Sequence, residues 1–118
     1  MPRTHKDLKV WEKSIDFVTT IYKITKNFPK DEIYGLVSQL RRASVSISSN
    51  IAEGAVRNGK KEFVQFLYIA LSSASEVETQ LIISYKLNYI PKDEYEMMIN
   101  EVHSISKMIQ GLIKSVIS

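Results

Sequence analysis

The 118-residue sequence has no cysteine, two histidines, three prolines and four glycines. Without cysteine it can form neither a disulfide framework nor a thiolate metal site. It has no run of about 18 apolar residues that would cross a membrane, and no apolar segment near Met1 typical of a signal peptide. Its hydrophobic share of 44% and charged share of 25% are ordinary for a globular protein. We therefore expect one cytoplasmic domain over residues 1–118, with no membrane partner.

The scarcity of histidine restricts the chemistry that the chain can perform. His5 lies in a basic amino-terminal tail, and His103 lies on the polar face of a predicted helix. A di-iron site needs Glu-x-x-His pairs, whereas Glu101 and His103 are two residues apart and point about 200° away from each other. The serines lack a suitably placed base, and no glycine-rich phosphate loop is present. The sequence predicts a protein that is not an enzyme and has no metal, cofactor or small-molecule substrate.

The net charge of +3 is unevenly distributed along the chain. Residues 1–61 contain 12 Lys or Arg against six Asp or Glu, whereas residues 62–118 contain four against seven. A basic half would attract an anionic partner such as RNA. The same charge would also serve solubility alone, because it is not gathered in one run.

Apolar residues repeat at helical spacing in four segments, at about residues 7–27, 32–56, 60–88 and 91–117. The first helix is expected to end before Pro29, the second at Asn58-Gly59, and the third before Pro91. Four helices joined by short turns predict an all-α, antiparallel up-down-up-down four-helix bundle.

The second predicted helix has two different faces. Its core-facing stripe consists of Ile33, Leu36, Val37, Leu40, Ala43, Ser44, Ile47, Ile51 and Ala55. The opposite face carries Gly35, Arg42, Ser46, Ser49 and Glu53, with Ser38, Gln39 and Asn50 at its edges. An exposed helix face is usually filled with Lys, Glu and Gln. We interpret the small residues as a contact surface; the alternative is a serine-rich face in water.

More apolar surface is present than a single bundle can hide. Either Ile69, Ile83 and Leu87, or the stripe of Val10, Phe17, Ile21 and Ile24, would be exposed on a monomer. Soluble monomers seldom expose an apolar patch of several hundred Å². Closed cyclic symmetry would bury such a patch on every copy, so we expect a cyclic homo-oligomer.

Two interpretations of the polar residues in the second and third helices remain open. In the first, Gly35, Arg42, Ser46, Asn50, Glu53, Glu76 and Glu78 form a structural or interface polar network. In the second, nucleic-acid phosphates are bound by Arg41, Arg42, Arg57, Lys60 and Lys61. No exposed aromatic residue is expected among these cations, so RNA contact would depend on phosphate and shape.

Several motifs resemble the family of 23S rRNA intervening-sequence proteins. They are Phe28-Pro29, Tyr34-Gly35-Leu36, the segment RRASVSISSNIAEG at residues 41–54, and Leu87-Asn88-Tyr89-Ile90. The resemblance implies a homopentamer of antiparallel four-helix bundles with no established reaction. Members are encoded in insertions within 23S rRNA genes and elsewhere in bacterial genomes, and a related branch is the accessory protein of diversity-generating retroelements.

Two functions follow as hypotheses. The first is a non-enzymatic oligomer associated with RNA or a nucleoprotein through phosphate contacts. The second is a protein–protein scaffold or accessory subunit without any nucleic-acid contact.

Overall fold

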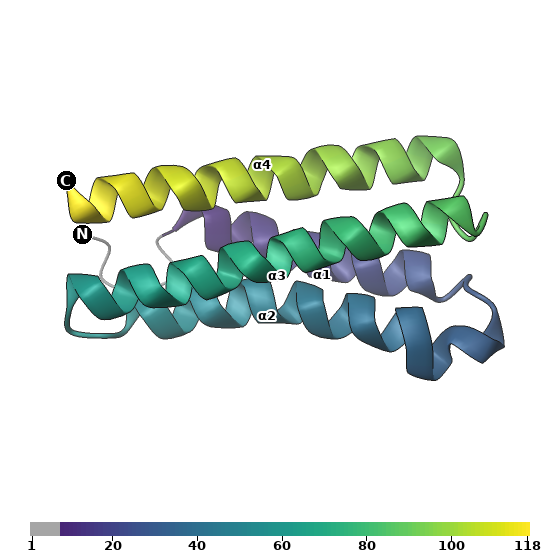
Figure 1. The fold of residues 1–118 in the computed structure, drawn as a ribbon, viewed down its shortest axis with the longest axis horizontal. Helices are drawn as coiled ribbons and strands as arrows, with labels where there is room; N and C mark the ends of the chain where they lie inside the picture. Colours follow the sequence, from purple (N-terminus) through teal and green to yellow (C-terminus); the bar gives the residue numbers. More distant parts are fainter. Residues whose placement is uncertain (1–7) are drawn as a thin grey trace.

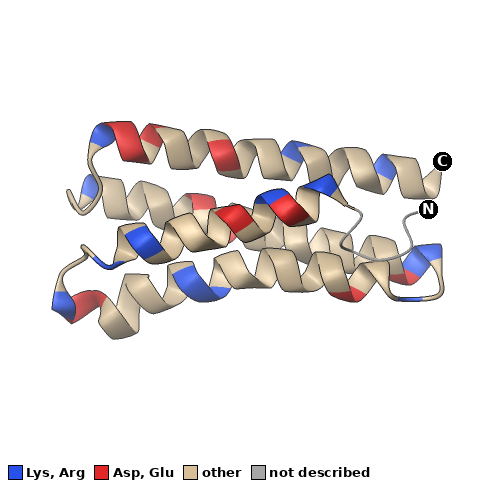
Figure 2. Ribbon diagram, turned by 180° about the vertical axis from the view of Figure 1, so that it is seen from behind, with Lys and Arg blue, Asp and Glu red and all other residues tan. Residues whose placement is uncertain are grey.

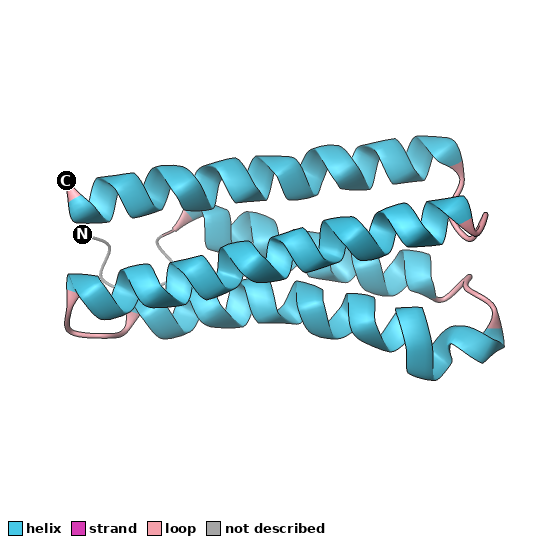
Figure 3. Cartoon of the chain, in the orientation of Figure 1, coloured by secondary structure: helices cyan, strands magenta, loops and turns pink. Residues whose placement is uncertain are grey.

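The computed structural model describes residues 8–118, which are helical throughout except for short connections (Figure 3). The four long helices are α1 (Lys9–Thr25), α2 (Ser38–Ala55), α3 (Lys60–Lys86) and α4 (Lys92–Ile117). Two short turns, η2 (Lys30–Glu32) and η3 (Ile33–Val37), precede α2. No strand occurs among these described residues, which confirms the prediction of an all-α chain with four long helices. The predicted tail at residues 1–6, with His5, lies outside the described part.

The four helices lie side by side along a body of 43 × 24 × 19 Å. Figure 1 places the α2–α3 connection at the end that also holds the carboxyl terminus, and the other two connections at the opposite end. The core fills the space between the helices, and its fully buried side chains include Phe17, Leu40, Leu67 and Ile105. Between residues 8 and 118, no helix is both long and apolar enough to cross a membrane.

The start of the second predicted helix differs from the expected regular geometry. Gly35 has φ −111° and ψ −116°, which breaks the helix, and the Glu32 carboxylate accepts a hydrogen bond from the Leu36 N–H at 3.1 Å. Because the turn before this break is rotated away from the core, Ile33 is 51% exposed. The prediction that Ile33 belongs to the core stripe was wrong.

The structure also decides which surplus apolar surface is exposed. Val10, Phe17, Ile21 and Ile24 are buried in the core of the bundle. By contrast, the apolar side chains on the outer surface of α3 are exposed, with Ile69 at 48%, Ile83 at 43% and Leu87 at 48%. Two other large apolar residues of α1, Ile15 and Tyr22, are exposed at the surface.

Candidate functional site

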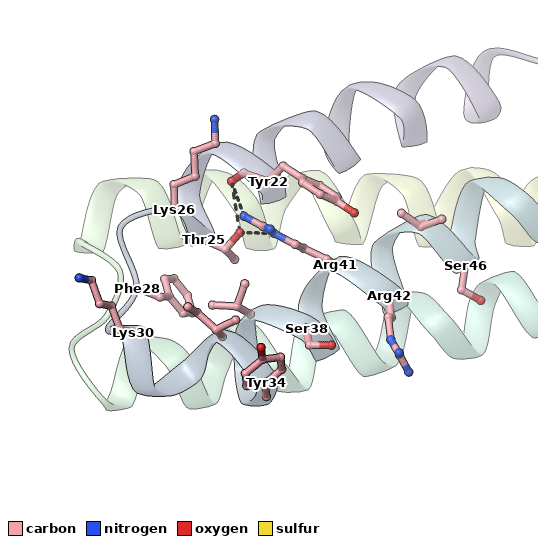
Figure 4. A pocket seen from close by; sticks show the side chains of 13 residues that line it. Tyr22, Thr25, Lys26, Phe28, Lys30, Tyr34, Ser38, Arg41, Arg42 and Ser46 are labelled. Atoms are coloured by element: carbon pink, nitrogen blue, oxygen red, sulfur yellow. Dashed lines mark hydrogen bonds between the residues drawn. The ribbon is translucent and has the colours of Figure 1, made fainter.

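A groove of about 880 Å³ lies between α1 and α2, at the end where the chain passes through η2 and η3 (Figure 4). Buried Phe28 and Val37 contribute to its apolar lining, while Tyr34 and Val45 are exposed. Its four cationic lining residues are Lys26, Lys30, Arg41 and Arg42, and no carboxylate lines it. The groove is therefore apolar inside and positively charged around it.

Arg41 joins α1 to α2. Its Nε donates to the Thr25 hydroxyl at 3.0 Å, and its Nη2 donates to the Tyr22 carbonyl at 3.3 Å. The guanidinium also lies 4.4 Å from the centre of the Tyr22 ring, a cation–π contact. Figure 4 shows these bonds inside the groove. Because two of its N–H donors and its cation–π contact all go to α1, Arg41 holds the two helices together.

Arg42 has the opposite environment. Its side chain is exposed and points away from that of Arg41 (Figure 4). It lines both the groove and a smaller depression shared with Gln39 and Glu76. Within residues 8–118 it forms no ion pair. Its guanidinium is therefore free to meet a carboxylate or phosphate from another molecule.

The other predicted phosphate ligands lie at the far end of α2. Arg57 pairs with Glu53, with 3.0 Å between Nη2 and Oε2, and its guanidinium lies 5.0 Å from the centre of the Phe66 ring. Lys60 and Lys61 are exposed and, in the described part of the chain, unpaired. Arg42 and Arg57 are 15 residues apart, about 22 Å at the rise of a helix. The predicted phosphate site is thus divided between two places.

The predicted polar network is also divided. Ser46 and Asn50 do come together, because the Asn50 amide donates to the Ser46 carbonyl at 2.8 Å and to its hydroxyl at 3.0 Å. The Ser46 hydroxyl lies 2.8 Å from that of Ser73 on α3, a partner that the sequence did not identify. The signal in the sequence that could have identified Ser73 is a small polar residue at the edge of the core-facing stripe of α3.

The remaining members of the network have separate partners. Glu53 pairs with Arg57, and Glu78 lies 3.0 Å from a ring nitrogen of His103. Gly35 lies against Glu32, since a Cβ placed there would be 2.6 Å from its carboxylate oxygen. Arg42 and Glu76 line one depression without an ion pair between them, as judged over residues 8–118.

Sequence reasoning missed the aromatic residues beside the cations. Tyr34 is 96% exposed and Tyr22 is 40% exposed, and both line the groove with Arg41 and Arg42. The prediction that no exposed aromatic lies among these cations was wrong. Helical periodicity groups Tyr22 with apolar residues of the first helix, and it does not show that this side of the helix reaches the surface.

A hydrogen bond anchors η2 to the connection between α3 and α4. The Tyr89 hydroxyl donates to the Glu32 carboxylate at 3.0 Å, and the Tyr89 ring packs against Phe28 with 5.4 Å between centroids. The hydrogen bond to Glu32 raises the pKa of Tyr89 above its ordinary value of 10.0, and partial desolvation adds to this increase. The contact fixes Phe28, which lines the groove, and so holds that end of the groove in place.

The described residues form four long helices with a basic, apolar groove between α1 and α2. Across residues 8–118, no three His, Asp or Glu side chains gather where they would hold a metal ion. The model of the 23S rRNA-intervening sequence protein family matches residues 6–111. The chain belongs to this family.

One similar solved structure is a protein of unknown function from the S23 ribosomal protein family of Bacteroides thetaiotaomicron. It is 30% identical, with a TM-score of 0.80, and the alignment covers 89% of this chain and 98% of the other. A search of curated proteins finds no match to the chain. Neither the family description nor this structure names a reaction.

Proposed function

We propose that the chain forms antiparallel up-down-up-down bundles that close into a cyclic homo-oligomer and associate with RNA through phosphate contacts, without catalysis. The observation that carries the RNA association is the pair Lys60 and Lys61, which are exposed and unpaired within the described chain. Figure 2 shows that the basic segment between α2 and α3 lies at one end of the bundle. In the oligomer, the basic segments of all copies would meet one RNA surface at that end.

The position of these lysines supports a binding role. They occupy the first turn of α3, where the positive end of the helix dipole disfavours cations and favours phosphate. Gly59 before them has no side chain to cap the first N–H groups. Arg57, one turn away, would add a third cation if an RNA phosphate replaced Glu53 as its partner.

Exposed apolar side chains support the oligomer. Tyr34, Ile69 and Ile83 are all more than 40% exposed, and they lie on two sides of a small protein. Patches of this kind usually mark an interface. A count of five copies is what the family resemblance implies.

The scaffold without nucleic acid remains the second candidate. The apolar lining of the groove favours it, because a protein side chain would fill such a site and phosphate would not.

A titration of a fluorescent RNA hairpin across salt concentrations tests the RNA association. We expect log affinity to fall linearly with log salt, with a slope of about −0.9 per phosphate contacted. Reversing both charges in Lys60→Glu with Lys61→Glu should make the slope shallower by about 1.8 for each chain that touches the RNA. The matched control is Lys107→Glu, which removes an exposed cation from α4 and should leave the slope unchanged. Absence of binding at low salt would favour the scaffold.

A further inference from the structure

Two exposed faces of the bundle have no partner within residues 8–118. The groove face, between α1 and α2, consists of the groove cations and the exposed side chains Ile15, Tyr22, Ile33, Tyr34 and Val45. The α3 stripe consists of Ile69, Glu76, Ile83 and Leu87, which recur on one side of that helix. We propose that the groove face of one copy binds the α3 stripe of the next copy. This inference rests on the oligomer proposed above and identifies the surfaces that form it.

The charges of the two faces are complementary. The groove has four cations and no carboxylate along its lining, and none of these cations forms an ion pair in the described chain. The α3 stripe has one exposed carboxylate, Glu76, which is likewise unpaired within residues 8–118. An acidic, apolar helix face is therefore the kind of partner that fits a basic, apolar groove.

The two faces also match in position along the bundle. The hydroxyl contact between Ser46 and Ser73 places these residues at one level on α2 and α3. Counting from them toward η3, Glu76 lies three residues away and Arg42 four, so both lie about 5–6 Å from that level. Ile83 and Leu87 lie ten and fourteen residues from Ser73, about 15 and 21 Å. Counted at the same rise, Tyr34 and Ile33 lie about 18 and 20 Å from Ser46, between these two levels.

The apolar residues at the other end of the two faces match as well. Ile69 lies four residues beyond Ser73 in the opposite direction, about 6 Å. Arg41 is hydrogen-bonded to Thr25, which places Ile15, ten residues earlier on α1, about 7 Å beyond Ser46 on the same side. Along the bundle, each face therefore has apolar residues, then a charged residue, then apolar residues again, at the same three levels.

Matching levels predict the symmetry of the assembly. A pure rotation about an axis parallel to the helices keeps every residue at its own level, so the two faces would meet in register. Around the bundle, α2 contacts both α1 and α3. Glu76 of the α3 stripe shares a depression with Gln39 and Arg42 of α2, so the stripe lies on the α2–α3 side, next to the groove face on the α1–α2 side. Adjacent sides of a square arrangement of four helices face directions about 90° apart. When two such sides form the contacts with the neighbouring copies, a ring of about four or five copies closes.

This arrangement gives the serine-rich face of α2 a role. The edge shared by the two faces points to the ring axis, where neighbouring copies approach most closely. Ser38 and Ser49 lie on that edge, and small side chains permit the approach. The Lys60–Lys61 segments of all copies would then form one basic rim, because a rotation keeps them at one end of the ring.

Mixing two defective variants tests the pairing. Val45→Glu places a charge on the groove face, and Ile83→Glu places one on the α3 stripe; both positions are partly exposed. By light scattering we expect each variant alone to have the mass of one chain. An equal mixture should have the mass of two chains, because each variant keeps one intact face. Ile117→Glu, on α4 away from both faces, should keep the mass of the parent protein.

The outcomes separate this inference from the proposed oligomer. If both variants assemble like the parent, or if the mixture stays at one chain, the pairing of these faces is wrong although the oligomer stands. If the parent protein itself is a monomer, the proposed oligomer fails too. Circular dichroism checks folding, and Tyr34→Glu with Leu87→Glu provides a second pair should either variant lose its helices.

Discussion

Arg41 and Arg42 are adjacent in sequence and differ completely in environment. Arg41 is half-buried and donates to α1, whereas Arg42 is exposed and unpaired in the described chain. Adjacent residues on a helix point about 100° apart, so one faces the neighbouring helix and the other faces outward. At the scale of residues, a pair of arginines therefore divides into one that stabilises the bundle and one that is available to a partner.

The hydrogen bond between Tyr89 and Glu32 predicts a pH dependence. Because its pKa is raised in the folded protein, Tyr89 stabilises the fold below the unfolded value of about 10, and this contribution is lost as the pH rises through the folded value. Tyr89→Phe removes one tyrosine from an ultraviolet titration of the folded protein. The difference between the parent and this variant, which is the Tyr89 signal, should titrate above pH 10. The matched control is Tyr68→Phe, which removes an exposed tyrosine. A Tyr89 signal titrating at or below 10 would contradict the contact.

At the scale of elements, two glycines differ in what surrounds them. Gly54, in the last turn of α2, is buried against α3, and a Cβ there would lie 2.9 Å from the Phe66 Cβ and 3.2 Å from the Phe63 carbonyl oxygen. Around Gly111 of α4, nothing lies within 4 Å of such a Cβ. Gly111 therefore does not mark a close helix crossing. The close approach between helices is at Gly54.

Alanine at the two positions should have opposite effects. Gly54→Ala would force α2 and α3 apart, so we expect a loss of about 1–3 kcal/mol in the free energy of unfolding. Gly111→Ala should gain up to about 1 kcal/mol, because alanine favours a helix interior and meets no obstacle. Urea unfolding at one fixed protein concentration measures both. A stabilising Gly54→Ala would show that the helices do not pack as closely as the structure describes.

At the scale of the whole molecule, assembly should be visible in thermal stability. If folded chains associate, dilution favours the unfolded state, and about a hundredfold dilution removes up to about 2.7 kcal/mol per chain. We expect the melting temperature of the parent protein to fall by several degrees over that range. Val45→Glu, expected to be monomeric, should melt at one temperature throughout. A parent protein that melts independently of concentration would contradict a reversible assembly.

The sequence by itself determined the four long helices. Their apolar periodicity, and the breaks at Pro29, Asn58-Gly59 and Pro91, are local signals carried by neighbouring residues. The break at the third helix has a clear geometry in the structure, since Asn88 adopts a left-handed φ of 65°. The prediction that the chain is not an enzyme rested on composition in the same way. Such inferences need no knowledge of which helices pack together.

Only the tertiary structure decided which predicted residues meet. Ser73 meets Ser46, and Glu78 meets His103, because helices distant in sequence are brought to one level. Glu53 instead pairs with Arg57, four residues further along the chain, and so does not join the predicted network. Periodicity gives a residue's direction around its own helix and says nothing of what lies across from it. For the same reason the sequence predicts Ile33 in the core stripe, whereas the break at Gly35 leaves it at the surface. The packing of α1 against α2 likewise leaves Tyr22 exposed.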